Sequence, residues 1–277
     1  MQASQHMVRT GRRGLGHEYA MAFGDLVASL RNLGLAWSLA WHDVIARYRG
    51  SIIGPFWITL SMGFMVAGIG FLYAHLFQIP VQQFVPYVAC GIVFWGLIAN
   101  MMVEGCGTYT HAAGMLNQTA LPMFTFVWRT ALRNIINLGH HMVIILAVLL
   151  IYGQWRSSDL PAALLGFLLV MCNLTWISLL AGIASARFRD VPQIMMSLTQ
   201  FAMFITPVFW HPGEKLMNHA LLVFNPFFHM LEAVRAPLLG QQAPAQAYIV
   251  LAVMALAGWA SAFVVFTLTR RRIVHYL

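Results

Sequence analysis

Two arginines flank a tyrosine in the stretch RYRGSIIGPFWITL, residues 47–60, where a long apolar run begins. A guanidinium group is a planar fork of N–H donors, so Arg47 or Arg49 can hold a phosphate group at two points, which a lysine ammonium cannot do. Tyr48 lies between them, and Gly50 and Gly54 leave room for a bound group. The same residues also suit a simple anchor, in which the arginines stay with lipid headgroups while the glycines let the chain turn into the bilayer.

The other polar side chains form no catalytic or metal-binding motif. The sequence lacks H-E-x-x-H, G-x-S-x-G and a paired Asp motif that would hold a metal and a sugar phosphate. Cys90, Cys106 and Cys172 lack C-x-x-C spacing and predict neither a disulfide framework nor a zinc site. His140 and His141 point about 100° apart on a helix, so we expect buried, hydrogen-bonded histidines rather than a proton relay. We therefore expect no catalytic residue, metal or cofactor in this chain.

The sequence also lacks the P-loop motif for nucleotide binding. A P-loop requires G-x-x-x-x-G-K-[ST], but the single lysine, Lys215, lies in HPGEKL. Any ATP and Mg²⁺ must then be bound by a partner protein.

The composition indicates a membrane protein. Hydrophobic residues make up 60% of the chain and charged residues 9%, against about 25% charged residues in soluble domains. The net charge of +8 does not indicate nucleic acid, because the basic residues lie near the ends of apolar runs. We expect an all-α integral membrane protein with six transmembrane helices, whose apolar runs cover about 55–77, 86–103, 132–152, 162–184, 193–210 and 248–269.

The basic residues predict the orientation. With six crossings, thirteen of them fall on the side of the two termini and three on the other side, Arg156, Lys215 and Arg235. The positive-inside rule then places both termini in the cytoplasm.

The region before the first crossing divides the chain into three parts. Apolar residues at steps of three and four predict an amphipathic interface helix over 25–49; packing of this helix on a soluble domain is the alternative. Residues 1–24 are expected to be a cytoplasmic tail, and 50–277 the six-helix transmembrane domain. Asp25, Arg31 and Asn32 interrupt the segment after the basic N-terminus, so no removable signal peptide is expected.

Aromatic side chains suggest a path for a sugar polymer. Aromatic rings can stack on the apolar faces of sugars, although contact with lipid is the more usual reason for such rings. In the first crossing an aromatic face lies beside a face of small residues, Gly63, Ala67, Gly70 and Ala74, which predicts helix packing. The candidates for a glycan conduit are Trp57, Phe64, Phe71, Tyr73, Trp95 and Trp210.

Three stretches resemble a known family: LAWHDVIARYRGSIIGPFWITLSMGFMVAGIGFLYAHLF, ARFRDVPQIMMSLTQFAMFITPVFWHPGE and NPFFHMLEAVRAPLLG. Together they span about residues 39 to 240, and they are similar to the permease subunits of ABC-2 type polysaccharide exporters, which move lipid-linked O-antigen, capsule and teichoic acid chains. The resemblance implies a bacterial inner-membrane homodimer that pairs with two cytoplasmic ATPase subunits and has short re-entrant helices before the last crossing. It also implies a cargo with a pyrophosphate next to its lipid.

The resemblance further implies a cytoplasmic helix, between the second and third crossings, that docks on the ATPase. The residues that match it are Leu116, Asn117, Gln118, Thr119 and Pro122. Many relatives carry basic residues before the proline, and this chain does not.

The favoured function is thus the permease subunit of an ATP-driven exporter of a lipid-linked surface glycan. An ABC-2 exporter of a small lipid or drug, which would lack the aromatic conduit, is one alternative. A membrane-embedded glycosyltransferase is another, and it would need an acidic sugar-nucleotide site.

Overall fold

The computed structural model describes residues 14–212 and 219–277, and all its regular elements in these ranges are helices. The expected all-α class is therefore confirmed. Within the described residues, eleven α-helices and a 3₁₀ turn follow one another in the order α1 (Leu15–Arg31), α2 (Leu33–Arg47), α3 (Phe56–Phe77), α4 (Val81–Thr110), α5 (Ala113–Gln118), α6 (Phe124–Ile151), η1 (Gln154–Arg156), α7 (Leu160–Arg187), α8 (Val191–Ile205), α10 (Ala220–Val223), α11 (Pro226–Leu238) and α12 (Ala245–Tyr276).

Five of these helices are long and apolar enough to cross a membrane, namely α3, α4, α6, α7 and α12. The fifth predicted run, 193–210, differs from expectation because α8 ends at Ile205. Its 15 residues rise only about 22 Å as a helix, less than the roughly 30 Å of hydrocarbon. Pro207 accounts for the early end, since the residue before a proline is disfavoured in helical conformation. A sixth crossing through this region remains a prediction.

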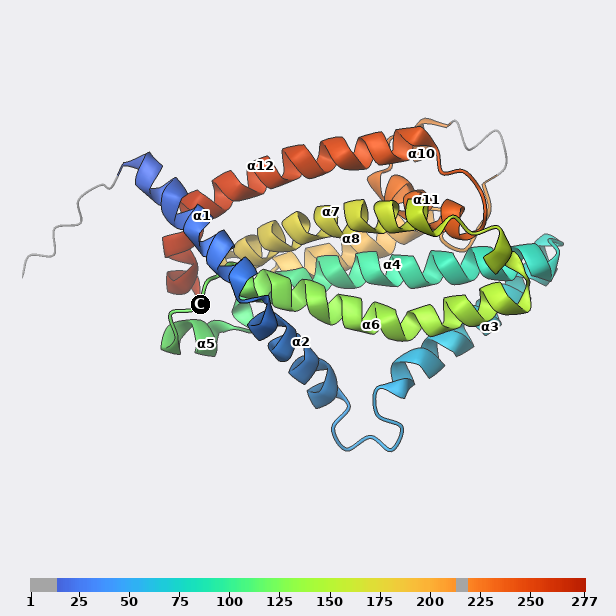
Figure 1. Cartoon of the computed structure of the whole chain (residues 1–277), viewed down its shortest axis with the longest axis horizontal. Helices are drawn as coiled ribbons and strands as arrows, with labels where there is room; N and C mark the ends of the chain where they lie inside the picture. Colours follow the sequence, from blue (N-terminus) through green and yellow to red (C-terminus); the bar gives the residue numbers. More distant parts are fainter. Residues whose placement is uncertain (1–13, 213–218) are drawn as a thin grey trace, which may run out of the picture.

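Helix α4 forms the centre of the bundle. It packs against α3, α6, α7, α8 and α11, and most of its membrane-length segment is buried. The long helices run side by side around it (Figure 1). Helices α4 and α7 pack closely, because Gly105 and Gly182 let the two backbones meet, and Ser178 donates a hydrogen bond to the Met101 carbonyl at 2.9 Å. Small residues and interhelical hydrogen bonds are the usual means of helix association in membranes.

The segment before the first crossing is longer and more broken than predicted. Instead of one helix over 25–49 there are two helices, and the first begins at Leu15, inside the expected tail. The chain breaks at Asn32, whose side chain donates back to the Ala28 carbonyl at 3.1 Å and closes α1. Helix α1 extends further toward the N-terminus because α12 covers it: Ala22 is fully buried, and Glu18 pairs with Arg271 at 2.7 Å.

Helix α2 has two distinct faces. Ala36, Ala40 and Val44 are buried, and α2 packs on α6, whereas Trp37 and Trp41 stack on the exposed side with ring centroids 6.4 Å apart. The predicted apolar stripe therefore divides between a packed face and an exposed aromatic face. Exposed tryptophans suit the depth of a membrane interface, so the interface role of this region remains our prediction.

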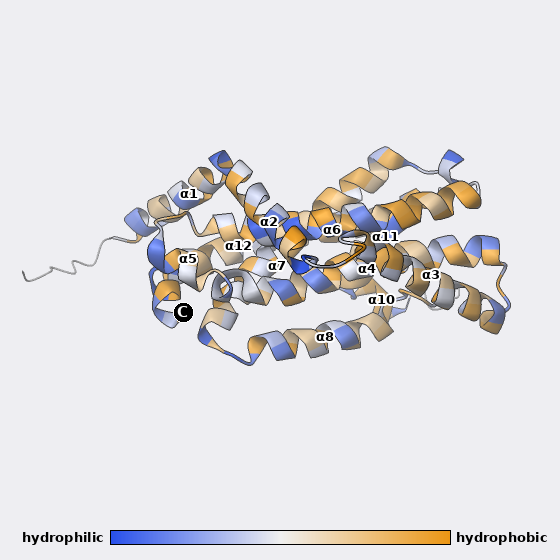
Figure 2. Ribbon diagram, turned by 90° about the horizontal axis from the view of Figure 1, so that it is seen from below, coloured by the Kyte–Doolittle hydropathy of each residue, from blue (hydrophilic) through white to orange (hydrophobic). Residues whose placement is uncertain are grey.

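The two ends of the bundle differ in character. Helix α1, helix α5 and the end of α12 gather at one end, hereafter the α5 end, where hydrophilic segments are frequent (Figure 2). At the opposite end, the α3–α4 connection, η1 and the end of α11 meet. Gln154 there donates to the Gln82 carbonyl at 3.3 Å, and Ser158 donates to the Leu238 carbonyl at 2.6 Å.

The first prediction concerns which end faces the cytoplasm. In a variant whose three cysteines are replaced, a cysteine at Gln82 should react with a membrane-impermeant thiol reagent in intact cells. A cysteine at Gln118 should react only after the membrane is opened, because the basic residues lie mostly at the α5 end. Both positions are exposed, so access depends on the side of the membrane. The reverse labelling pattern would contradict the orientation.

Candidate functional site

Five charged side chains from three helices form a connected cluster, which we call the arginine–carboxylate network. Asp43 accepts two hydrogen bonds from Arg129, from Nε at 2.8 Å and Nη2 at 2.5 Å, and one from Arg133 at 3.0 Å. Glu104 accepts two from Arg133, at 3.0 and 2.9 Å, and one from Arg47 at 3.2 Å. Helices α2, α4 and α6 are thereby joined through Asp43, Glu104 and their arginines.

Helical spacing explains how the network forms. Asp43 and Arg47 are four residues apart on α2, and Arg129 and Arg133 are four apart on α6, so each pair lies on one helix face. Glu104 on α4 completes the cluster, and the side chain of Asn134 also donates to it at 2.9 Å. All members except Arg47 are largely buried.

The network carries three positive and two negative formal charges. Burial alone would raise the pKa of Asp43, but hydrogen bonds and positive charge from Arg129 and Arg133 outweigh it, and the pKa is lowered from its ordinary value of 3.8. Asp43 is therefore ionised at neutral pH, and one positive charge of the network remains uncompensated.

Arg47 is where that excess charge reaches the surface. Its side chain is 53% exposed and forms a single hydrogen bond within the described residues, whereas Arg49 is exposed and forms no ion pair in them. Tyr48 is half-buried against the packed face of α2. The structure thus brings Arg47 into contact with the protein core and leaves Arg49 outside it.

Gly50 and Gly54 have left-handed backbone angles, with φ of +85° and +61°. A Cβ atom added at either position would meet no atom within 4 Å. Both glycines are therefore required by the turn between α2 and α3. Glycine is needed at these positions for its backbone conformation, and not because a side chain would clash. The predicted room for a headgroup stays a prediction.

Sequence reasoning treated Arg129 and Arg133 only as orienting charges and did not assign them to a site. The sequence does show that Asp43 and Arg47 have the same four-residue spacing as Arg129 and Arg133. It does not show that Asp43 pairs with these two arginines, because they lie 86 and 90 residues away along the chain.

The six conduit candidates do not share one surface in the single chain. Trp57, Phe64 and Phe71 lie on one exposed face of α3. Trp95, by contrast, is buried in the core with its ring edge-on to Phe227.

The two remaining conduit candidates, Tyr73 and Trp210, make different contacts. The ring of Tyr73 contacts those of Phe77 and Phe209, and the indole of Trp210 donates to the Phe204 carbonyl at 3.2 Å. Only the α3 face presents several of the predicted aromatic rings together on the outside.

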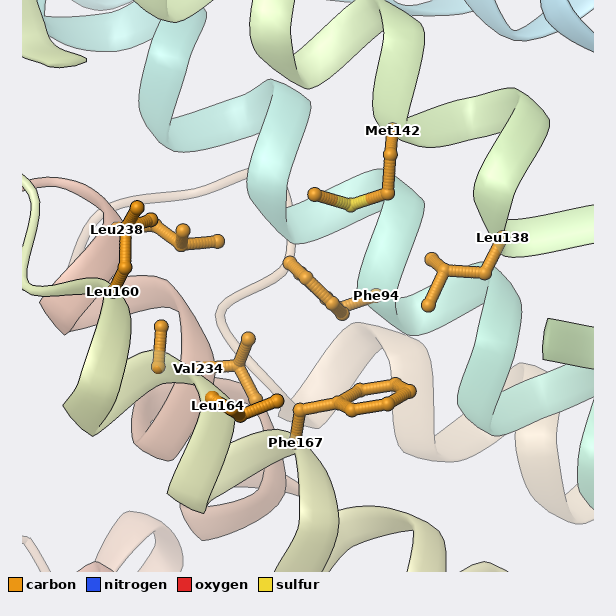
Figure 3. Close-up of a pocket in the computed structure, with 9 residues that line it drawn as sticks. Phe94, Leu138, Met142, Leu160, Leu164, Phe167, Val234 and Leu238 are labelled. Carbon is orange, nitrogen blue, oxygen red and sulfur yellow. The ribbon is translucent and has the colours of Figure 1, made fainter.

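An apolar cavity of about 380 Å³ lies between α4, α6, α7 and α11. Phe94, Met142 and Phe167 point into it together with leucine and valine side chains (Figure 3). Its lining is hydrocarbon apart from the methionine sulfur, so it provides no donor or charge for a headgroup or a sugar.

Most of this chain matches a known protein family. The model of the ABC-2 type transporter family matches residues 34–239, which run from the start of α2 to just beyond α11 and make up 206 of the 277 residues. The chain belongs to the ABC-2 type transporter family. Together with its five long apolar helices, this membership makes it a multi-pass membrane protein.

A curated protein is also similar to most of this chain. The chain is 25% identical over 214 residues to the O-antigen export system permease protein RfbA of Myxococcus xanthus, covering 73% of this chain and 79% of that protein. Within this ABC-2 transporter, the matched region contains all five members of the arginine–carboxylate network.

The predicted ATPase-docking residues of the transporter fall on and just after α5. Asn117, Gln118 and Thr119 are exposed, while Leu116 packs against the core cluster below. Pro122 follows before α6, and the N-terminus of α6 is held by Asp25 of α1. The position between α4 and α6 agrees with the sequence-based expectation, and the docking role stays a prediction.

The second prediction concerns the stability of the network. An Asp43→Asn substitution should lower the free energy of unfolding by about 2 kcal/mol, because Arg129 and Arg133 lose their shared carboxylate while they stay buried. Thermal unfolding in detergent should show a melting temperature about 5 °C lower. The matched control is Asp190→Asn, an exposed aspartate without an ion pair in the described residues, which should change stability by less than about 0.5 kcal/mol.

The pH dependence provides a second readout of the same change. A carboxylate whose pKa is lowered by folding stabilises the protein above its unfolded pKa, and this contribution is lost as the pH falls through the folded value. The difference in melting temperature between wild type and Asp43→Asn should thus be constant near neutral pH and shrink below the ordinary value of 3.8. Equal melting temperatures for the two aspartate variants would contradict the role of the network.

Proposed function

We propose that this chain is the permease subunit of an ATP-driven exporter that moves a lipid-linked polysaccharide, an O-antigen or a similar surface glycan, across the bacterial inner membrane. The observation that carries the proposal is the match to the O-antigen export permease, which extends over about four-fifths of that protein. The proposed orientation places both termini and the α5 end in the cytoplasm, in keeping with the excess of arginines there.

Two alternatives have less support. An ABC-2 exporter of a small lipid or drug has the same fold, but the similarity to a polysaccharide permease and the aromatic face of α3 favour a glycan. A membrane-embedded glycosyltransferase would need an acidic sugar-nucleotide site. The carboxylates of Asp43 and Glu104 are instead occupied by arginines.

The proposed complex contains two copies of this chain, two cytoplasmic ATPase subunits and surrounding membrane lipids, with no role for nucleic acid. ATP and Mg²⁺ would be bound by the ATPase, since the sequence has no P-loop and one lysine. The exposed side chains of α5 suit contact with that partner, because α5 projects at the end of the bundle (Figure 1).

The third prediction concerns energy coupling. The purified chain should not hydrolyse ATP, and its cognate ATPase should co-purify with it. A double substitution of Asn117→Ala and Gln118→Ala should reduce this co-purification, because both side chains are exposed on the proposed docking helix. Gln242→Ala at the opposite end is the control and should not. Robust hydrolysis by the chain alone would contradict the proposed division of labour.

The proposed cargo also gives a role to Arg47 and Arg49. The pyrophosphate of a lipid-linked glycan would approach from the headgroup region beside the turn between α2 and α3. Arg47 has a single hydrogen bond to Glu104 there, and Arg49 has no ion pair within the described residues, so their N–H groups remain available to phosphate oxygens. We infer that Arg47 or Arg49 admits the headgroup, with Tyr48, Gly50 and Gly54 shaping the turn around it.

The fourth prediction tests the function and this role in one assay. Deleting the gene should leave the glycan on its lipid carrier inside the cell, and the wild-type gene should restore export. A double substitution of Arg47→Lys and Arg49→Lys should restore it poorly, because lysine keeps the charge but loses the bidentate fork. The control is Arg189→Lys with Arg272→Lys, two exposed arginines at the same end.

Membrane levels and ATPase co-purification must match between the two double variants. Normal export by the Arg47 and Arg49 variant would leave these arginines with an anchoring role only. Unchanged surface glycan in the deletion strain would instead reject the proposed function itself.

A further inference from the structure

A polar cavity lies at the end of the bundle opposite α5. Its volume is about 480 Å³, and the side-chain amides of Gln83, Gln154 and Gln241 contribute to its lining, together with the rings of Tyr87 and His211. This volume is within the range of small-molecule sites, which measure roughly 300 to 1,000 Å³. The cavity differs from the one between α6 and α7, whose lining is almost entirely hydrocarbon.

The three glutamines come from different parts of the chain. Gln83 is in the first turn of α4, Gln154 begins η1, and Gln241 follows α11. The latter two each come directly after a left-handed glycine, at φ of +72° and +73°. The backbone N–H of Gln241 also donates to the Ala236 carbonyl at 2.8 Å. These turns and hydrogen bonds hold the three amides around one space.

The amides have hydrogen-bonding capacity that the protein does not use. A glutamine side chain offers two N–H donors and an acceptor oxygen. The side chains of Gln83 and Gln241 are exposed and make no hydrogen bond within the described residues. Gln154 donates to the Gln82 carbonyl, but its own oxygen is buried without a partner in that part of the chain. Leaving such a group unpaired costs free energy that a ligand hydroxyl could recover after a small side-chain rotation.

Among the described residues, those that line the cavity include no aspartate, glutamate, lysine or arginine. The nearest buried charges are those of Arg235 and Glu232, which pair with each other beneath the cavity wall. Arg235 stacks on the ring of Tyr87, 3.9 Å from its centroid, and donates to the Pro207 carbonyl at 2.7 Å. Because Glu232 compensates its charge, Arg235 stiffens the wall without attracting an anion.

The phenol of Tyr87 is likewise committed. Its hydroxyl donates to the carbonyls of Pro207 and Trp210, each at 3.2 Å, and its ring lies 4.9 Å from that of His211. Tyr87 and His211 therefore form a fixed aromatic wall, and the amides supply the free polar groups on the other sides.

We propose that this cavity binds one or two neutral sugar residues. Sugar hydroxyls both donate and accept, which matches unpaired amides, and the C–H faces of a sugar suit an aromatic wall. The proposal rests on the proposed function only for the source of the sugar, which would be the glycan of the exported cargo on the far side of the membrane.

The test uses two neighbouring pairs of glutamines. In each pair one residue lines the cavity and the other does not: Gln83 beside Gln82, and Gln241 beside Gln242. Binding of the neutral disaccharides maltose and mannobiose to the purified full-length chain would be measured by ligand-observed saturation-transfer NMR. The double variant Gln83→Leu, Gln241→Leu should bind about tenfold more weakly. The control Gln82→Leu, Gln242→Leu should bind like the wild type, and a sulfated disaccharide of the same size should not bind.

A second measurement does not depend on the leucine variants folding normally. A cysteine at Gln241 should be protected from a thiol reagent by the neutral disaccharide, and a cysteine at Gln242 should not be. The proposal is overturned if neither disaccharide binds at about 10 mM, if both double variants weaken binding equally, or if the sulfated disaccharide binds as well as the neutral ones.

Failure of this proposal can be told from failure of the proposed function. Disaccharide binding is measured on the purified chain without ATPase or transport, whereas the function is tested by surface glycan in the deletion strain. Binding without any export defect would reject the exporter and keep the site. An export defect without binding would reject the site and keep the exporter.

Discussion

Charged groups inside an apolar protein are stable only when they are paired, and this constraint explains how the half of the bundle toward the α5 end is built. Removing one partner from a largely buried ion pair costs about 2 kcal/mol or more, because the remaining charge is only partly hydrated. Asp43 and Glu104 must therefore be paired with Arg129 and Arg133 once the carboxylates are buried. Because Asp43 is on α2, its ion pairs fix α2 to the transmembrane core. The turn that follows α2 therefore also has a defined position.

The two ends of the molecule accordingly present different chemistry. The proposed cytoplasmic end has an excess of guanidinium groups, one of them half-exposed on Arg47. The opposite end has neutral amides around an aromatic wall, and its single buried arginine is neutralised by Glu232. A cargo with an anionic headgroup and an uncharged polymer would meet a matching surface at each end. In the proposed exporter, this difference between the two ends would constrain the cargo more than the aromatic residues, of which Trp95 is part of the core.

Much of the fold follows from the sequence because lipid demands long apolar helices with internally satisfied backbones. The runs 55–77 and 162–184 fall on α3 and α7 with small differences at the ends, and the run 132–152 falls on α6, which begins earlier, at Phe124. The start of α1 could not be predicted, because its stability comes from contact with α12 at the other end of the sequence. The same reason explains the network: spacing predicts which face carries Arg129 and Arg133, but partner choice depends on how three helices pack.

Asp25 has a further consequence for how the chain is made. Its carboxylate accepts hydrogen bonds from the backbone N–H groups of Met123 and Phe124, at 3.1 and 3.0 Å, and from Arg270 at 3.2 Å. The acceptor emerges early from the ribosome, the two amides near the middle of synthesis, and the guanidinium near the end. The buried carboxylate of Asp25 therefore lacks the positive charge of Arg270 until nearly the whole protein has been translated. Chains that stop before Arg270 would retain an incompletely neutralised acid among apolar helices.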